Sequence, residues 1–423
     1  MFSRLICTSL LGAVIVLLSG CGGSSNGGGG CATPASCPCT NCGGNSTTVT
    51  YTFSGSTATA VATKIGSGAW TQASLESNTL SLSIPNGTTD YSVAYVCQQF
   101  DERIYLASTL DGTSIPVSCL GISGSTGLAT VQVNASAIPN AYWILIYGIE
   151  SQIFAEQTTA GTQSLSGQLA AGTSDVAVMI QDRNSNVLAV KILRSQTIPG
   201  ALNGGNAVVF TTSDETVETA ASFANIPAGF YVPGTLVNFI SKGGLRLGIS
   251  DWVGGTSTYL SMPSNAFQTG DVQLLNPEAI DSNSIYHSVS LENYATSGGP
   301  QTFTFPAQWT YAGPTAAALP TFDYTYAGYS GLSQVTPDAV LTYTDSKSNS
   351  TDLIVVVATE NYQGGATSLE IPDLSALTGF PAAPASGESV NWNADIEAGG
   401  NGIASPFTGN IPEVSNGGKY TVP

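Results

Sequence analysis

The stretch Gly87-Thr88-Thr89-Asp90-Tyr91-Ser92-Val93-Ala94-Tyr95-Val96 carries the pattern on which the fold prediction rests. A polar turn with glycine runs into alternating large and small residues, the two-residue period of a β-strand. The pattern returns 85 residues later as Gly172-Thr173-Ser174-Asp175-Val176-Ala177-Val178, and a Ser-Leu-Ser stretch precedes both copies. The chain therefore repeats a strand-forming unit.

A second repeat has nearly the same period. Ala137-Ile138-Pro139-Asn140 is echoed by Asn225-Ile226-Pro227-Ala228, which lies 88 residues further on. Two independent echoes indicate modules of about 85–90 residues, the size of a seven-stranded β-sandwich. In rhythm and size the modules resemble the immunoglobulin-like β-sandwiches of bacterial surface proteins.

Composition favours the same fold class. The 423 residues include 48 Gly and 21 Pro, which interrupt long helices and favour turns. The fold class predicted is all-β, with tandem antiparallel, immunoglobulin-like β-sandwich modules that follow a flexible lipidated tether. The predicted divisions are a signal peptide at 1–20, a tether at 21–48, β-sandwich modules at 49–124, 128–216 and 217–306, a divergent β-rich module at 307–408 and a loose tail at 409–423.

The N-terminus carries a targeting pattern. Arg4 precedes an apolar run from Leu10 to Leu18, too short to cross a bilayer as a helix. The following Leu18-Ser19-Gly20-Cys21 resembles the lipobox of bacterial lipoproteins. That resemblance implies cleavage before Cys21, acylation of its sulfur with a fatty acid such as palmitate, and a membrane anchor. The alternative is an ordinary cleaved signal with an unmodified cysteine.

The predicted location is the bacterial cell envelope. Gly22 after the acylated cysteine implies, by the same resemblance, transport to the outer membrane or cell surface. The expected partners are the membrane, through the lipid anchor, and an envelope polysaccharide or a surface protein. Nucleic acid is excluded as a partner, because 10 Lys and Arg against 28 Asp and Glu give a net charge of −18.

Cysteine use fits export. Cys7 leaves with the signal and Cys21 takes the lipid, so an even number remains in an oxidising compartment, which favours disulfides. Cys97 and Cys119 stand alone in the first module and are the preferred pair. The other four, Cys31, Cys37, Cys39 and Cys42, are expected to form disulfides of unknown connectivity. A metal held by four thiolates is the alternative for this cluster.

No catalytic constellation is evident. His287 is the only histidine and lies in a strand-like context, which favours a solvent-facing strand residue over a Ser-His-Asp base. Carboxylate pairs such as Glu278 with Asp281, or Asp214 with Glu215 and Glu218, can be assembled in any acidic protein. The protein is therefore predicted not to be an enzyme.

Calcium is the one ion that the sequence suggests, and no other cofactor is expected. Asp182, Asn184 and Asn186 match the first ligand positions of an EF-hand loop, but Val187 replaces the glycine that such a loop requires. A hairpin turn explains the same polar residues.

One aromatic row is a candidate binding feature. Tyr324 and Tyr326 alternate along a strand with Phe322, and Trp309 lies upstream. Side chains at alternate positions share a face, so Tyr324, Tyr326 and Trp309 could stack on sugar rings. The competing interpretation makes the row the inward face of the last sandwich. Two hypotheses follow: a non-enzymatic lipoprotein that displays β-sandwich modules for surface binding or adhesion, and a carbohydrate-binding or carbohydrate-processing lipoprotein with its site in the C-terminal module.

Overall fold

The computed structural model describes residues 46–55, 58–97, 101–119, 126–149, 151–156, 161–250, 257–325, 335–344, 351–364, 366–398 and 410–423. Its regular structure is almost entirely β-strand, which confirms the predicted fold class. The α-helix α1 (Glu360–Gln363) is one turn long. None of the helices in these ranges has the length and apolar character needed to span a membrane. The signal peptide, Cys21 and the Cys31–Cys42 cluster lie outside the described residues.

Module 1 (residues 47–119) is a two-layer sandwich of seven strands. One sheet has the order β4-β1-β7, with β1 parallel to β7, and the other has the order β3-β2-β5-β6. Its strands are β1 (Thr47–Gly55), β2 (Ala60–Ile65), β3 (Thr71–Ala73), β4 (Thr79–Ile84), β5 (Asp90–Cys97), β6 (Asp101–Ser108) and β7 (Ser114–Cys119). Alternate residues of β5, among them Val93 and Tyr95, face the buried side chains of the first sheet.

Module 2 (residues 126–209) repeats this arrangement. Its sheets have the orders β11-β8-β14 and β10-β9-β12-β13, and β15 also pairs in parallel with β8. Its strands are β8 (Thr126–Asn134), β9 (Trp143–Gly148), β10 (Ser151–Glu156), β11 (Thr162–Ala170), β12 (Gly172–Gln181), β13 (Val187–Ile198), β14 (Gly200–Ala201) and β15 (Val208–Val209), with the 3-10 helix η1 (Leu202–Gly205) between the last two.

Module 3 (residues 217–304) has the same plan, with the orders β19-β16-β22 and β18-β17-β20-β21. Its strands are β16 (Val217–Ala224), β17 (Phe230–Ile240), β18 (Arg246–Ser250), β19 (Thr258–Ser261), β20 (Val272–Asp281), β21 (Ser284–Ala295) and β22 (Gln301–Thr304). The 3-10 helix η2 (Thr212–Asp214) precedes it, and η3 (Ser264–Ala266) follows β19.

Module 4 (residues 321–421) supplies six strands to the same plan. They are β23 (Thr321–Asp323), β24 (Val335–Thr344), β25 (Thr351–Ala358), β26 (Ser368–Glu370), β27 (Ser389–Ala398) and β28 (Asn410–Thr421). Beside β23, where the other modules place their parallel strand, the hydroxyl of Tyr311 accepts the Asp323 backbone N–H at 3.3 Å. The Tyr311 side chain thus accepts a backbone N–H of β23 on the side where a parallel strand pairs in the other modules.

The sequence echoes occupy equivalent turns of the repeated fold. The turn at 87–89 leads from β4 into β5, and Gly172 opens β12 directly after β11. Likewise 137–140 lies between β8 and β9, and 225–228 lies between β16 and β17. The two echoes therefore mark two different turns of one architecture.

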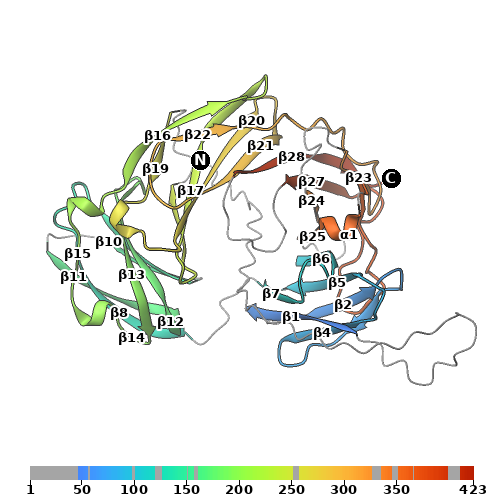
Figure 1. Cartoon of the computed structure of the whole chain (residues 1–423), viewed down its shortest axis with the longest axis horizontal. Helices are drawn as coiled ribbons and strands as arrows, with labels where there is room; N and C mark the ends of the chain where they lie inside the picture. The colour runs from blue at the N-terminus through green and yellow to red at the C-terminus, as the bar shows by residue number, and fades with distance from the viewer. Residues whose placement is uncertain are drawn as a thin grey trace, which may run out of the picture.

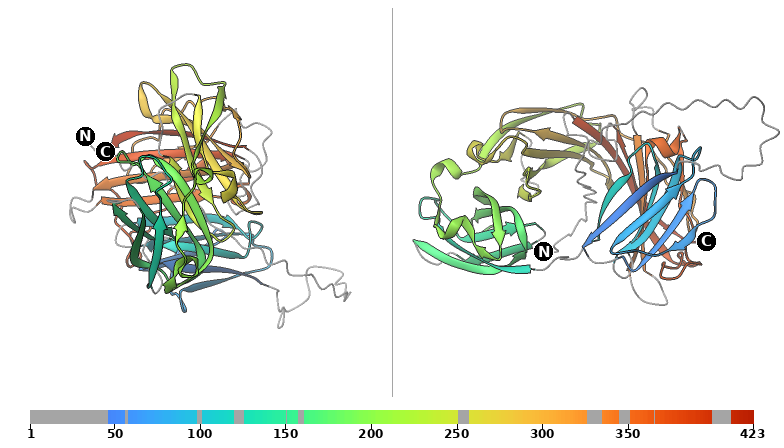
Figure 2. Two further views of the ribbon diagram at one scale, coloured as in Figure 1. Left: turned by 90° about the vertical axis from the view of Figure 1, so that its left-hand side faces the viewer. Right: turned by 60° about the horizontal axis from the view of Figure 1, so that its bottom comes forward.

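A single sheet of twelve strands joins three of the four modules, in the order β18-β17-β20-β21-β28-β27-β24-β25-β6-β5-β2-β3. Strand β21 of module 3 pairs with β28, and β25 of module 4 pairs in parallel with β6 of module 1. The first module thus pairs with the last module. The four modules form an arch (Figures 1 and 2), whereas tandem repeats suggest an extended rod.

The stretch 409–423, expected to be a loose tail, is a further difference from the sequence prediction. Residues Asn410–Thr421 are β28, a central strand between β21 and β27. Its Asn-Gly-Gly sequence reads as a loop, but a Cβ on Gly418 would lie 3.0 Å from Trp392 Nε1. The glycine is required because the indole of Trp392 packs directly on the strand.

Polar clamps hold the modules together. Between modules 2 and 3, the Arg194 guanidinium binds Asp271 at 2.5 Å and Asp175 at 3.0 Å, and both carboxylates are nearly inaccessible. Between modules 1 and 4, Asp111 accepts hydrogen bonds from Thr359 at 2.5 Å and from Asn361 at 2.6 Å. Each clamp bridges parts of the chain far apart in sequence.

Candidate functional site: an acidic ladder on the twelve-stranded sheet

Six carboxylic side chains gather on the part of the twelve-stranded sheet where modules 3 and 4 meet. This acidic ladder consists of Glu278 on β20, Glu292 on β21, Asp338 on β24, Asp395 and Glu397 on β27, and Glu413 on β28. Their neighbours along the strands, such as Ala279, Ile396 and Val414, are buried in the apolar core. Because side chains alternate between the faces of a strand, the ladder lies on the face opposite that core.

Strand register brings the acids together. Asp338 lies directly opposite Asp395, and Asp395 lies opposite Ser415. In the next row, Glu397 lies opposite Glu413, which in turn lies opposite Ser290 of β21. Like charges directly opposite each other destabilise a sheet, so two such pairs in adjacent rows are a costly arrangement.

Hydroxyl and amide groups satisfy part of the ladder. The Ser290 hydroxyl donates to Glu413 Oε2 at 3.0 Å, and the Asn393 amide donates to Asp395 Oδ2 at 2.6 Å. Asp395 is 7% exposed, and its Oδ1 has no hydrogen-bond partner among the described residues. The same holds for Oδ1 of Asp338. Two buried carboxyl oxygens thus lack a donor.

Burial and mutual repulsion raise the pKa of these acids above the values of exposed Asp and Glu side chains. Burial, reinforced by Asp395 and Glu413, raises the pKa of Asp338 well above its usual range. Burial raises the pKa of Asp395, Glu413 and Glu278 for the same reason. The pKa of Glu397 rises to about 7 through burial and the nearby Glu292. Glu397 therefore titrates near neutral pH, and the other acids with a raised pKa keep their protons to a higher pH than an exposed Asp or Glu does.

Sequence reasoning missed the ladder. It considered Glu278 only with Asp281, whereas the structure places Glu278 opposite Ser290 of β21 and ties Asp281 into the turn with Asn283. Most of the other ladder acids are far apart in sequence. The available signal was acidic residues at alternate positions of a strand-like stretch, as in Asp395 and Glu397.

The aromatic row belongs to the core where it is described. Trp309 is 5% exposed and Tyr324 is 7% exposed, and their rings stack with centroids 5.6 Å apart. Tyr311 stacks on the other face of Trp309 at 4.8 Å. The Tyr324 hydroxyl donates to the backbone oxygen of Asp338. Tyr326 lies outside the described residues. Trp309 and Tyr324 thus pack in the interior beside β23, with Tyr311 half-buried next to them.

Cys97 and Cys119, the pair favoured by the sequence, form a disulfide with Cα atoms 5.1 Å apart. Cys97 ends β5 and Cys119 ends β7, and both are buried. The bond therefore ties the two sheets of module 1 together across its core.

The other candidate residues take structural positions. His287 lies on β21 and is partly exposed, as predicted, with Nδ1 3.5 Å from Asp281. Asp214 is 2% exposed and forms a capping box with Thr211 at η2. It also pairs with Lys191 at 3.1 Å. Backbone and side-chain hydrogen bonds lower its pKa despite burial. Asp214 thus has a structural role at the boundary of modules 2 and 3.

The polar residues at 182–186 form the predicted hairpin turn between β12 and β13. Asp182 Oδ1 accepts the backbone N–H groups of Asn184 at 2.8 Å and Asn186 at 2.9 Å. These hydrogen bonds, with one from the Asn186 side chain, lower the pKa of Asp182. Within the described part of the chain, no group of three or more His, Cys, Asp or Glu residues is arranged to hold a metal ion.

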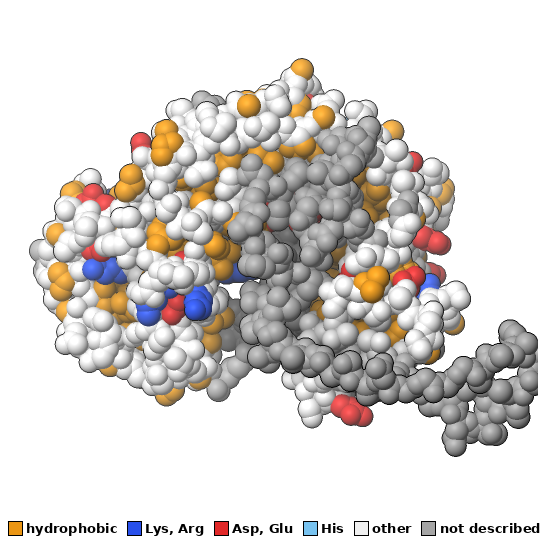
Figure 3. Space-filling model, viewed as in Figure 1, with side chains coloured by type: hydrophobic (Ala, Val, Ile, Leu, Met, Phe, Trp, Pro, Cys, Tyr) orange, Lys and Arg blue, Asp and Glu red, His pale blue; other side chains and the backbone are white. Residues whose placement is uncertain are grey.

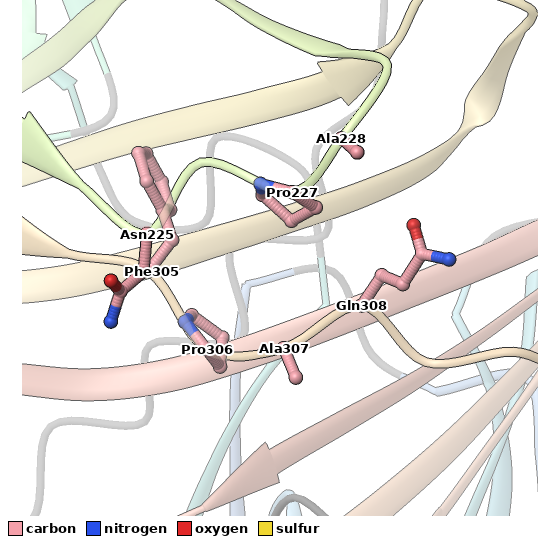
Figure 4. Close-up of a pocket in the computed structure, with 7 residues that line it drawn as sticks. All are labelled: Asn225, Pro227, Ala228, Phe305, Pro306, Ala307 and Gln308. Atoms are coloured by element: carbon pink, nitrogen blue, oxygen red, sulfur yellow. The ribbon is translucent and has the colours of Figure 1, made fainter.

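A shallow hollow of about 440 Å³ lies at the boundary of modules 3 and 4 (Figure 4). Its lining is Asn225, Pro227, Ala228, Phe305, Pro306, Ala307 and Gln308. The lining contains the side-chain amides of Asn225 and Gln308 and no charged side chain, so the hollow offers few polar groups to a ligand. The equivalent loop of module 2 is longer and buries Ile138, whereas Ile226 is 41% exposed.

Charge is unevenly distributed over the arch. On the face shown in Figure 3, the Lys and Arg side chains gather over module 2. Arg183, Lys191, Arg194, Lys242 and Arg246, half of the ten basic residues, fall within 64 consecutive positions at modules 2 and 3. Of these basic residues, Arg246 interacts with Tyr294 at the edge of the acidic ladder.

No protein-family model and no curated protein matches the chain. Among solved structures, it is similar to a proposed carbohydrate-binding protein from Bacteroides uniformis ATCC 8492, with 8% identity over 70% of this chain and 99% of that chain and a TM-score of 0.14. It is also similar to a Ca²⁺-stabilized, ice-binding adhesin of an Antarctic bacterium, with 10% identity over 87% and 90% and a TM-score of 0.11. A third similarity is to the TIE protein of Bacillus anthracis, with 10% identity over 88% and 66% and a TM-score of 0.15. At such TM-scores none of these similarities carries an argument about function.

Proposed function

We propose that this protein is an exported, lipid-anchored, non-enzymatic binding protein of the bacterial cell envelope. The observation that carries the proposal is the pairing of Leu18-Ser19-Gly20-Cys21 at the N-terminus with the disulfide between Cys97 and Cys119. Stable disulfides are typical of proteins that fold outside the reducing cytosol. An acylated cysteine anchors such a protein to a membrane.

The architecture supports a display role. One continuous twelve-stranded sheet fixes modules 1, 3 and 4 in a single arch, and the clamp at Arg194 fixes module 2 to module 3. Because paired strands connect the modules, the arch holds its exposed loops in constant relative positions. A partner would therefore bind a surface that is already organised. The glycine-rich sequence after Cys21 has the composition of a flexible linker, which would give the arch reach from the membrane.

Membrane fractionation tests the anchor. Full-length protein with Cys21→Ser should move from the membrane fraction to the soluble fraction and lose metabolic labelling with palmitate. Cys7→Ser is the matched control, because that cysteine precedes the cleavage site and its loss should leave fractionation unchanged. Persistence of Cys21→Ser in the membrane fraction would contradict the proposal.

Binding is tested with the released Cys21→Ser protein. Saturable binding to one envelope polysaccharide, one cell-wall fraction or one surface protein supports the display role, and the bound fraction identifies the partner class. Rapid turnover of a peptide, ester or glycoside substrate by the same preparation would overturn the non-enzymatic part.

A further inference from the structure

The acidic ladder poses a charge problem that ion pairing does not solve. Among the described residues, the ion pairs within 4.0 Å involve Asp101, Asp175, Asp214, Asp271 and Asp281, and none involves a ladder acid. Asp395 is 7% exposed and Asp338 is partly buried. Buried charges are expensive unless they are paired or neutralised, so these acids need another source of compensation.

Asp338 and Asp395 compensate each other. They lie directly opposite each other on β24 and β27, where opposite side chains on one face are close neighbours, and each carboxyl group affects the pKa of the other. Two ionised carboxylates at that separation repel, whereas one carboxylic acid and one carboxylate form a strong hydrogen bond. Oδ1 of each residue has no donor among the described residues, and a proton shared between the two carboxyl groups would supply one.

We propose that Asp338 and Asp395 share one proton, and that this proton fastens β24 to β27 within module 4 as a pH-sensitive latch. The latch is closed in acid and weakens toward alkaline pH. The step is a simple acid dissociation: the O–H bond of one carboxylic acid breaks, and the proton passes to water or hydroxide.

The groups that face the pair share its response. Glu397 on β27 and Glu413 on β28 act on Asp338, and when ionised their negative charges favour the proton on the pair. Glu292 on β21 acts on Glu397 and Glu413, and Glu278 on β20 interacts with Asp395. From the other side of β24, Tyr324 contacts the Asp338 backbone. Tyr311 lies near Tyr324. At the edge of the ladder, Arg246 interacts electrostatically with Tyr294.

The sign of the effect follows from proton linkage. Groups whose pKa is raised by folding bind more protons in the folded state than in the unfolded chain. Their stabilising contribution is complete below the unfolded pKa of about 4 and is lost as the pH rises through the folded pKa. Because Asp338 and Asp395 lie opposite each other on β24 and β27, this loss should loosen that strand pair first.

The test uses the full-length protein, with Asp338→Asn, Asp395→Asn and the double variant. Infrared difference spectra at pH 7 should show that each single variant loses the signal of one protonated carboxyl group. The double variant should lose no more than either single variant, because both acids hold the same proton. Glu370→Gln, at an exposed position on β26, is the matched control.

Hydrogen exchange supplies a second readout. In wild type, protection of residues 389–398, which form β27, should fall at least tenfold between pH 6 and pH 9 after correction for intrinsic exchange. In Asp338→Asn the fall should be at least threefold smaller, because the amide donates to Asp395 at every pH.

Three outcomes would overturn the proposal. The first is additive loss of two protonated signals in the double variant, which means two independent protons. The second is an unchanged pH profile in both single variants. The third is a wild-type profile that Ca²⁺ flattens and a chelator restores, which means that a cation neutralises the ladder.

Discussion

Glu102 offers a direct measurement of how a buried acid controls stability. It lies on β6 between β5 and β25 and is 3% exposed, and its Oε1 has no partner among the described residues. Burial, with a smaller contribution from Asp373, raises its pKa from 4.5 to about 8. Glu102→Gln keeps the shape of the side chain and removes its titration.

The magnitude follows from linkage. Between pH 4.5 and pH 8 Glu102 holds a proton in the folded protein and has lost it in the unfolded chain, so wild-type stability falls as the pH rises. An interval of about 3.5 pH units at about 1.4 kcal/mol per unit amounts to roughly 5 kcal/mol. Relative to wild type, Glu102→Gln should therefore gain roughly 5 kcal/mol between pH 4.5 and pH 8.

Urea denaturation followed by tryptophan fluorescence at pH 5, 6, 7, 8 and 9 measures this difference. The exposed Glu370→Gln variant should track wild type at every pH. Asp175 and Asp214 do not interfere, because their pKa values are lowered and their contribution changes only in more acidic solution. A constant difference between Glu102→Gln and wild type across this range would refute the reasoning.

Three further predictions concern other parts of the arch. Arg194→Ala should destabilise the boundary of modules 2 and 3 by about 3–5 kcal/mol, because two nearly inaccessible carboxylates lose their partner; urea unfolding measures it, and an unchanged midpoint would contradict it. Replacing Cys97 and Cys119 by serine should lower the free energy of unfolding by about 3 kcal/mol, since the disulfide closes a loop of 22 residues. Thiol labelling of the wild type without reductant should find neither cysteine free. Gly313→Ala should cost about 1–3 kcal/mol in thermal unfolding, because the glycine has a φ of +92° and a Cβ there would lie 2.7 Å from Trp392; wild-type stability in that variant would show that the indole moves freely.

Much of the local structure was readable because short-range patterns decide it. The alternation at Tyr91–Val96 and the two sequence echoes predict strands, turns and a repeated sandwich, and the structure places the echoes at equivalent turns. The hairpin at Asp182 was also predictable, because Asp and Asn side chains bond to backbone N–H groups two to four residues on. Such features depend on neighbours in the sequence.

The candidate site was not readable in this way. Asp338, Asp395 and Glu413 come from three strands, and each acid alone looks like a solvated surface residue. Only the register that sets Asp338 against Asp395 reveals an acidic pair. The strand at 410–421 escaped notice because its Asn-Gly-Gly run has low strand propensity, and packing against Trp392 outweighs that propensity.

The sequence by itself determined the all-β class, the repeated module and the preferred cysteine pair, because side-chain alternation, turn residues and cysteine isolation are local properties. The tertiary structure decided which strand edges meet. Edge strands of similar alternation can pair with many partners, and the pairing of β25 with β6 joins residues about 250 positions apart. That choice turns a string of modules into an arch and brings the ladder acids together.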